Sequence, residues 1–452
     1  MTSLVRAYLS ITLLVLVVAA TSACQSSTPE ELSRSTSLVI VHTNDFHGHI
    51  AEADESAGAA RIAQFFTRMR DQHENVLVLD AGDAISGTPV STLFSGEPIF
   101  EVMNSMGYDL GLLGNHEFDH GWRQIEKFRA AVDFPLLGAN ARGPGGELLA
   151  DLPYQIVTRG ELKIGVIGVL TESTPSMITP LGNEGVTFGE ARATLLELVP
   201  VLRPQVDVLV VLSHIGHVEE QALAASVPGI DVIVGGHSHT RISDPVQIGN
   251  TVVVQAYEYG KAVGVVELEV ATNNDAGVSL KQGYLVDASA MLDADPEVAS
   301  IVSEWEAKVS AQVDFEIAQA DRLIAPDELR GWMEWVIREH TGADISYYNR
   351  GGVRDAIRPG PVTARTIWNL EPFGNSVVTV RLTGAQVLSL LAINGDEAGI
   401  ELDHNKIYVL ATNSFIGAHA RKTFGESVEL QDAGVLVRDV LIDAIKQNGL
   451  PG

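Results

Sequence analysis

The chain of 452 residues contains a single cysteine, Cys24. With no second cysteine, no disulfide can form within the chain, so even an exported form of the protein would not depend on disulfide bonds. No internal repeat is visible either. Hydrophobic residues make up 46% of the sequence, which is ample for large cores. The length alone predicts two to three domains.

Positive charge is scarce. Lysine and arginine total 30 against 58 acidic residues, which gives a formal net charge of −28. Such a surface repels polyanions, so we expect no nucleic-acid polymer as a partner. A small anionic substrate stays possible where metal ions or arginines supply local positive charge.

The apolar segment at the N-terminus is too short to cross a membrane comfortably. Tyr8 to Ala20 have about the length of a signal-peptide core and follow one positive residue, Arg6. The small residues Thr21-Ser22-Ala23 before Cys24 resemble a bacterial lipobox, although Thr21 stands where leucine is usual. We predict a lipoprotein signal peptide at 1–23, acylation of Cys24, and an exported protein of the cell envelope or periplasm. The alternative is an ordinary cleaved signal peptide with an incidental cysteine.

Short apolar runs alternate with segments of helical periodicity after residue 38, a pattern that predicts a layered α/β domain with a parallel or mixed sheet. Two further strands are expected at 251–256 and 262–270, with no helix between them. The alternating strands are expected at 38–43, 76–80, 109–113, 163–170, 206–212 and 230–234, and the helices at 57–72, 97–106, 125–132 and 189–203.

A polar helix at 295–313 has few apolar anchors and suits a connector between two units. The second unit is long enough to bury its own core. Its expected elements are helices at 327–340, 384–394 and 434–447, strands at 344–348, 376–382 and 406–412, and a glycine-rich loop at 350–352. We therefore predict a flexible tether at 24–37, a first domain at 38–292, a linker helix at 293–318 and a second domain at 319–452.

The stretch from Gly114 to Gly121 directly follows a buried strand, at the end where open α/β sheets place their ligands. Asn115 can offer a metal an amide oxygen, and His116 can offer a ring nitrogen or a proton. Asp119, three residues on, could orient that imidazole. The alternative interpretation is a polar turn that caps a helix near Asp119.

Five strand ends deliver residue types that bind metals, and each has a simple alternative. Asp83 could cap a helix, His214 could be a core histidine, and His237 and His239 could be turn residues. All five ends falling at one sheet edge by chance is improbable. The mixed ligand set fits Zn, Mn, Fe or Co, and it suits two ions sharing Asp83, about 3.5–4 Å apart. The set comprises Asp45 and His47, Asp83, Asn115 and His116, His214, and His237 with His239.

These motifs resemble, in order, those of the calcineurin-like metallophosphoesterases, and the flanking sequences resemble the bacterial 5′-nucleotidase branch. The resemblance runs from about Leu38 to the C-terminus. The metal-site motifs are Asp45-Phe-His47, Gly82-Asp83, Gly114-Asn-His-Glu117, His214 and Gly236-His-Ser-His239. The flanking motifs are His42-Thr-Asn-Asp45, Gly114-Asn-His-Glu-Phe-Asp119, Gly235-Gly-His-Ser-His-Thr240, Asn349-Arg-Gly-Gly-Val-Arg354 and Glu371-Pro-Phe-Gly-Asn375.

The resemblance implies a four-layer α-β-β-α sandwich followed by a smaller α+β substrate-binding domain. It also assigns the metal ligands. One divalent ion would take Asp45, His47, Asp83 and His239, and the other would take Asp83, Asn115, His214 and His237. Some family members have Gln or Asn where this chain has His239. His116 would face the scissile phosphate as a catalytic residue, oriented by Asp119.

In the second domain, the resemblance implies that Arg350 and Arg354 bind phosphate or ribose oxygens, while Phe373 and Phe415 stack on the base. The alternatives are a core role for Phe373 and a solvated Arg350. The segment Thr412 to Ala420 lacks the acidic residue that usually contacts the sugar in this family, so nucleotide preference is open.

Together these observations predict a two-metal phosphohydrolase acting on 5′-nucleotides or related esters, such as cyclic nucleotides and nucleotide-sugar diphosphates. The membrane would be reached through the lipid anchor only, and no protein partner is predicted. Two alternatives remain open: a thiosulfate-hydrolysing relative with the same metal site, and a solute-binding lipoprotein on an inactive enzyme scaffold.

Overall fold

The computed structural model describes residues 35–451 except residue 54, residues 179–181 and 183, and 272–276, 394–400 and 426. Cys24, the predicted signal peptide and most of the predicted tether therefore lie outside the described residues. Residues 35–37, predicted as tether, already belong to the first strand, because they pair with strand β13 in the register that starts at Ser35 and Ala271. Within the described ranges, no helix has the length and apolar character that a membrane crossing requires.

Two β-sheets form the centre of the first unit. In the smaller sheet, β1 pairs antiparallel with β13 and parallel with β2. In the larger sheet, β7, β9, β10 and β12 run parallel, with antiparallel strands at both edges. The smaller sheet has the strand order β14 (Val278–Asp287), β13 (Ala262–Ala271), β1 (Ser35–Thr43), β2 (Val76–Asp80). The larger sheet has the order β11 (Val246–Ile248), β12 (Thr251–Gln255), β10 (Val232–Gly235), β9 (Val208–His214), β7 (Leu162–Leu170), β6 (Tyr154–Arg159).

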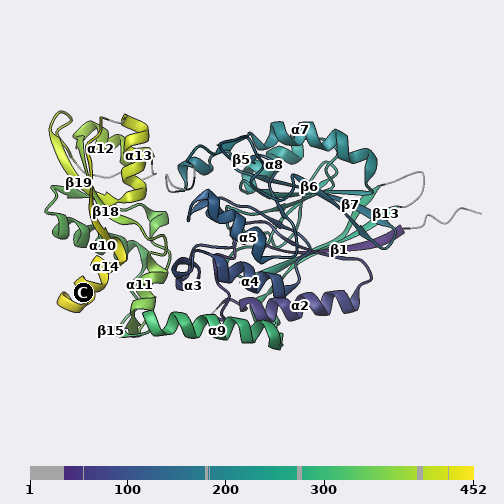
Figure 1. Ribbon diagram of the computed structural model, residues 1–452, viewed down its shortest axis with the longest axis horizontal. Helices are drawn as coiled ribbons and strands as arrows, with labels where there is room; N and C mark the ends of the chain where they lie inside the picture. The colour runs from purple at the N-terminus through teal and green to yellow at the C-terminus, as the bar shows by residue number, and fades with distance from the viewer. Residues whose placement is uncertain are drawn as a thin grey trace, which may run out of the picture.

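The two sheets pack face to face, and helices cover both outer faces. Alternation along β1 shows how this arises, because Leu38 and Ile40 enter the core between the sheets while Val39 and Val41 pack against helices. In Figure 1, α7 and α8 lie above the strands and α2, α4 and α9 lie below them. These helices, with α5, are α2 (Gly58–Gln72), α4 (Glu97–Met106), α5 (Ile125–Ala131), α7 (Ala191–Leu202), α8 (His217–Ser226) and α9 (Pro296–Val313). The predicted four-layer sandwich is confirmed.

Helix α9 joins the two units. Its buried residues are Val298, Val309 and Val313, and it packs along α2, α3 (Pro89–Leu93) and α4 of the first unit. Strand β15 then begins at Glu316, inside the segment predicted as a linker.

The second, smaller unit combines one four-stranded sheet with a two-stranded ribbon and five helices among its described residues. Figure 1 shows it beside the sandwich, in green and yellow. Its sheet has the order β16 (Ile345–Ser346), β19 (Ile407–Asn413), β18 (Ser376–Thr383), β20 (Leu430–Leu436), and the ribbon pairs β15 (Glu316–Ala320) with β17 (Gly360–Thr363). Its helices are α10 (Pro326–Thr341), α11 (Ala364–Leu370), α12 (Gly384–Ile393), α13 (Ser414–Phe424) and α14 (Val437–Asn448).

Several sequence-based boundaries were wrong, and the strand predicted at 344–348 shrinks to β16 (Ile345–Ser346). The helix predicted at 434–447 begins only at Val437, because the backbone of β20 pairs with β18 up to Leu436. The apolar residues Val435 and Leu436 fit the helical pattern, but hydrogen bonding of the edge strand β20 to β18 outweighs that local preference. The strand predicted at 109–113 shrinks to β3 (Gly111–Leu112), which pairs with β4 (Leu136–Leu137). Two further short strands, β5 (Ala141–Arg142) and β8 (Thr187–Phe188), pair with each other.

Candidate active site

The predicted metal-binding residues gather where neighbouring strands end. Asp45 and His47 follow β1, Asp83 follows β2, and Asn115 follows β3. In the other sheet, His214 is the last residue of β9, and His237 and His239 follow β10. The parallel pairs β1–β2 and β9–β10 bring these ends to one edge of the sandwich.

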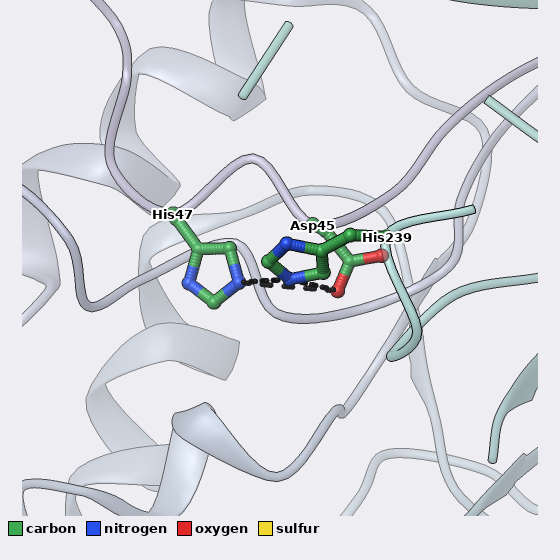
Figure 2. Close-up of side chains that lie close together, drawn as sticks. All are labelled: Asp45, His47 and His239. Atoms are coloured by element: carbon green, nitrogen blue, oxygen red, sulfur yellow. Dashed lines mark hydrogen bonds and ion pairs between the residues drawn. The ribbon is translucent and has the colours of Figure 1, made fainter. Parts of the chain in front are cut away.

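Three groups of potential ligand atoms form there, each with its atoms within 4.8 Å of one another, and two of them do not include His116. Figure 2 shows the first, in which the imidazoles of His47 and His239 face each other beside the Asp45 carboxylate. The two Nε2 atoms lie 3.1 Å apart, and Nε2 of His239 lies 3.4 Å from Oδ1 of Asp45. The second group is Asp83, His214 and His237. In it, Nε2 of His214 lies 2.9 Å from Oδ2 of Asp83.

The remaining predicted ligand joins the second group. The amide oxygen of Asn115 lies 2.9 Å from Nδ1 of His237. All seven predicted ligands are thus brought together, with Asp83 near both groups, since Nε2 of His47 lies 3.9 Å from its Oδ2.

The donor set fits divalent metal ions. Nε2 of His214 is buried and has no hydrogen-bond partner among the described residues, although a carboxylate oxygen is close. A buried polar atom without a partner is costly, and a cation between the two atoms would satisfy both. Nδ1 of His214 and Nδ1 of His47 donate to the carbonyl oxygens of Ala81 and Ser86, which leaves each Nε2 free to coordinate.

The backbone at these ligands is strained. Left-handed backbone angles are uncommon outside glycine and concentrate at functional sites. Five of the nine described non-glycine residues with positive φ are predicted ligands: Asp45, His47, Asp83, His237 and His239, with φ from 50° to 74°. The strand-end loops therefore hold these side chains in orientations that ordinary turns would not give.

The carboxylates and imidazoles already shift one another's protonation. Burial together with His116 and His239 holds the pKa of His47 well below its ordinary value. Burial also lowers the pKa of His214, but the adjacent Asp83 carboxylate outweighs it and raises that pKa to about 10. A protonated imidazole cannot coordinate, so metal binding at His214 would release a proton.

His116 and Asp119 form a contact beside this cluster. Nδ1 of His116 lies 2.6 Å from Oδ2 of Asp119, which also accepts a hydrogen bond of 2.7 Å from Ser86 Oγ. Nε2 of His116 faces Oδ2 of Asp83 at 3.9 Å. Burial lowers the pKa of His116, but Asp119 and Asp83 outweigh it and raise the pKa to about 9. Cations bound nearby would lower the pKa of His116.

A cavity of about 200 Å³ leads from this contact into the second unit. Of the four predicted substrate-binding residues, Arg354, Phe373 and Phe415 line it, whereas Arg350 is exposed and is not among its lining residues. Phe373 stacks on His116 at 6.0 Å between ring centroids, and the Arg354 guanidinium lies 5.7 Å from the Phe373 ring. The cavity is also lined by Asp119, Met177, Asn349, Gly351, Gly352 and Asn375.

Sequence reasoning missed several residues that support the site. Glu117 is buried, and its two carboxylate oxygens accept hydrogen bonds from the backbone of Gly114, Asp83 and Ala84. The hydroxyl of Tyr259 accepts a hydrogen bond of 2.7 Å from Arg354. Glu117 belongs to the motif Gly114-Asn-His-Glu117, so the sequence placed it near the site. The sequence did not show that its carboxylate binds the backbone of the neighbouring loops.

Comparisons with known proteins agree with this geometry. Residues 38–241 match the family model of calcineurin-like phosphoesterases, and residues 309–398 match that of the 5′-nucleotidase C-terminal domain. A 5′-nucleotidase from Vibrio cholerae is 29% identical over 443 aligned residues, which cover 83% of this chain and 79% of that protein.

Solved structures give the same picture. A 5′-nucleotidase precursor from Thermus thermophilus superimposes with a TM-score of 0.80 at 26% identity, covering 92% of this chain and 97% of that one. A sulfate thiohydrolase from the same organism superimposes with a TM-score of 0.77 over 92% of this chain and 95% of that one, but at 18% identity, which shows the fold alone.

The sandwich and its cluster of histidines and carboxylates define a calcineurin-like phosphoesterase, a metal-dependent hydrolase of phosphoesters. Because the nucleotidase C-terminal domain follows in the same chain, the protein belongs to the 5′-nucleotidase family.

Proposed function

We propose that the protein uses two divalent ions to release phosphate from nucleoside 5′-monophosphates or related nucleotide esters. The observation that carries the proposal is one cavity that is lined by His116 and Asp119 of the first unit and by Arg354, Phe373 and Phe415 of the second. A phosphate at the metal cluster and an aromatic base between the units fit this layout.

The ligand sets are assigned as follows. One ion is held by Asp45, His47, Asp83 and His239, and the other by Asp83, Asn115, His214 and His237. The convergence of these atoms in two groups supports the assignment. Zn, Mn, Fe and Co all suit the mixture of imidazole, carboxylate and amide donors. Bound there, the ions would activate a water molecule and neutralise charge on the phosphoryl oxygens.

His116 is assigned to catalysis. Its Nε2 also falls into a third group of possible ligand atoms, with His47 and Asp83. Two observations favour a catalytic role. Asp119 orients the ring of His116 through Nδ1, and His116 lines the cavity. From this position Nε2 can donate a proton to the leaving oxygen or stabilise charge on the phosphoryl group.

The second domain supplies the preference for nucleotides. Phe373 and Phe415 stack on the base, a contact that tolerates every base, and Arg354 binds phosphate or ribose oxygens. Arg350 is the weaker assignment, since it lies outside the lining of the cavity. The missing sugar-contacting acid near Thr412 should loosen discrimination among sugars.

A substrate panel on the purified protein, loaded in turn with each metal, tests the proposal. Nucleoside monophosphates should have a higher kcat/KM than glycerol phosphate or sugar phosphates, with little difference among bases. The panel includes a nucleotide sugar, a cyclic nucleotide and an organic thiosulfate ester. Turnover of the thiosulfate ester without turnover of nucleotides would favour the thiosulfate-hydrolysing alternative, and no turnover with bound metal would favour a solute-binding protein.

We also propose that the protein is exported and anchored through an acylated Cys24, on the strength of the apolar segment and small residues that precede the lone cysteine. Wild-type protein should partition into the detergent phase and carry an N-terminal diacylglycerol in mass spectra, whereas Cys24→Ala should do neither. An unmodified mature N-terminus located after Cys24 would contradict the anchor.

A further inference from the structure

His239 differs from the neighbouring imidazoles in what holds its outer nitrogen. Nδ1 of His239 contacts the carboxylate oxygen Oε2 of Glu258. The matching nitrogens of His47 and His214 donate to neutral backbone carbonyls instead. A carboxylate is a stronger acceptor than a carbonyl, so the inner nitrogen of His239 becomes the stronger donor toward an ion.

Glu258 is itself held in place. Its second oxygen, Oε1, accepts a hydrogen bond of 2.9 Å from Nζ of Lys261. The side chains of Glu258 and His239 are 15% and 21% exposed, so their contact is largely shielded from water. The carboxylate is therefore fixed between a cation and an imidazole, and water competes little for it.

The loop that carries Glu258 is tied directly to the metal cluster. The residues on either side, Tyr257 and Tyr259, have φ of 77° and 57°, a backbone conformation that L-residues rarely adopt. The amide of Tyr259 donates to the backbone oxygen of Asp45 at 2.7 Å, and the side chain of Asn44 donates to the backbone oxygen of Tyr257 at 2.5 Å. Strain kept by such contacts is typical of a functional loop.

We propose that Glu258 is a positioning residue that acts through His239 and sets the affinity and preference of one ion site. It fixes the tautomer of His239 with the proton on Nδ1, leaving Nε2 to coordinate. A charged partner of this kind favours ions that prefer imidazole, such as zinc, over ions that prefer oxygen ligands, such as magnesium. The inference rests on the ligand assignment of the proposed function, in which His239 belongs to the site with Asp45 and His47.

The test is zinc binding by the metal-free full-length protein, titrated against a chromophoric chelator in the absence of substrate. Wild type should bind two ions. Glu258→Gln keeps the size of the side chain and removes its charge, and it should weaken one binding step by roughly 10–100-fold while leaving the other unchanged. Glu258→Asp keeps the charge but shortens the side chain, and it should weaken the same binding step to a similar extent. It serves as the second variant in case Glu258→Gln does not fold.

A double-mutant cycle separates a specific role from general damage to the loop. In the His239→Gln background no imidazole tautomer has to be fixed, so adding Glu258→Gln should cost no further affinity. Glu55→Gln is the matched control, because Glu55 also faces Lys261, at 3.7 Å, but has a largely exposed side chain. It should leave both binding steps unchanged.

The outcomes are distinct. Two tight steps in Glu258→Gln, or an equal loss in the His239→Gln background, would overturn the role of Glu258 while leaving the proposed function intact. Wild type that binds no ion would overturn both. Wild type with two ions but no nucleotide hydrolysis would remove the proposed function, and the role of Glu258 would still be decided by the titration.

Discussion

His116 carries the most specific chemical assignment of any single residue in the protein. Its Nδ1 contacts Asp119, its Nε2 lies 3.9 Å from Oδ2 of Asp83, and the residue lines the cavity. Ser86 fixes Asp119 in turn. These contacts hold the imidazole in one orientation.

Replacing His116 with alanine should lower kcat by roughly 10²–10⁴ without removing the ions, because in the proposed mechanism the residue acts on the phosphoryl group and does not hold the metal. Steady-state kinetics and metal analysis of the same preparation check this. Asp119→Asn should give a smaller loss of kcat, since the ring remains. Loss of metal in His116→Ala would make His116 a ligand.

Asp80 is a buried acid that the proposed mechanism does not use. Burial raises its pKa to about 8, from an ordinary value of 3.8. Between these two values the folded state keeps a proton that the unfolded chain has released, so stability should fall as pH rises from about 4 to about 8. Its carboxyl accepts hydrogen bonds from Thr43 Oγ1 at 3.0 Å and from the amide of Gly82 at 3.1 Å.

Asp80→Asn cannot titrate, so its Tm should decrease less than that of wild type between about pH 5 and about pH 8. The difference should be several degrees, given roughly 2–4 °C per kcal/mol for domains of this size. Calorimetry of both proteins at the two pH values measures it. Equal decreases in Tm would mean that the Asp80 carboxyl is ionised in the folded state.

Among the structural elements, the short helical turn at His116–Phe118 connects the loop of Asp83 with the loop of Asn115. Glu117 points inward from this turn and binds the backbone of the loop after β2, which carries Asp83. The same carboxylate binds the amide of Gly114 at 2.7 Å. One buried side chain therefore sets the distance between the loop of Asp83 and the loop of Asn115.

Glu117→Gln would place an amide NH₂ against backbone N–H donors. Each buried donor left unpaired costs about 1–3 kcal/mol, so we expect a lower Tm together with weaker metal binding. Calorimetry and chelator competition measure the two effects. Glu126→Gln, an exposed acid on α5, is the control and should change neither. Normal metal affinity in Glu117→Gln would show that the loops keep their spacing without the charge.

For the whole molecule, the decisive feature is contact between the two units around the cavity. Thr92 Oγ1 donates to the backbone oxygen of Pro372 at 2.9 Å, and His419 contacts the backbone oxygen of Ser176. Arg354 from the second unit reaches Tyr259 in the first. His116 and Asp119 of the first unit and the aromatic residues Phe373 and Phe415 of the second unit therefore line one cavity.

Phe415→Ala should raise KM for nucleoside monophosphates by tenfold or more, because stacking contributes about 1–3 kcal/mol per base. Hydrolysis of a small aryl phosphate, which has no base to stack, should change far less. Phe315→Ala, at an exposed phenylalanine outside the cavity, is the control. Equal losses on both substrates would make Phe415 a core residue, and the nucleotide assignment would then lose its structural support.

The sequence by itself determined the layered α/β fold and the gathering of the predicted metal ligands at one sheet edge. The strand-end motifs are local, and parallel neighbouring strands must end at one sheet edge, so Asp45, Asp83 and Asn115 could be placed together without coordinates. The period-two and helical patterns of the first unit likewise fixed its main elements to within a few residues.

Only the tertiary structure decided what lies behind and between these motifs. The contact of Glu258 with His239 spans 19 residues, and the contact of Tyr259 with Arg354 spans 95, with no local pattern that announces either. β20 escaped prediction for the same reason, since its backbone pairing with β18 competes against an apolar pattern that reads as helix. Periodicity reports which face of a segment is buried, whereas partners distant in sequence are chosen by packing of the whole chain.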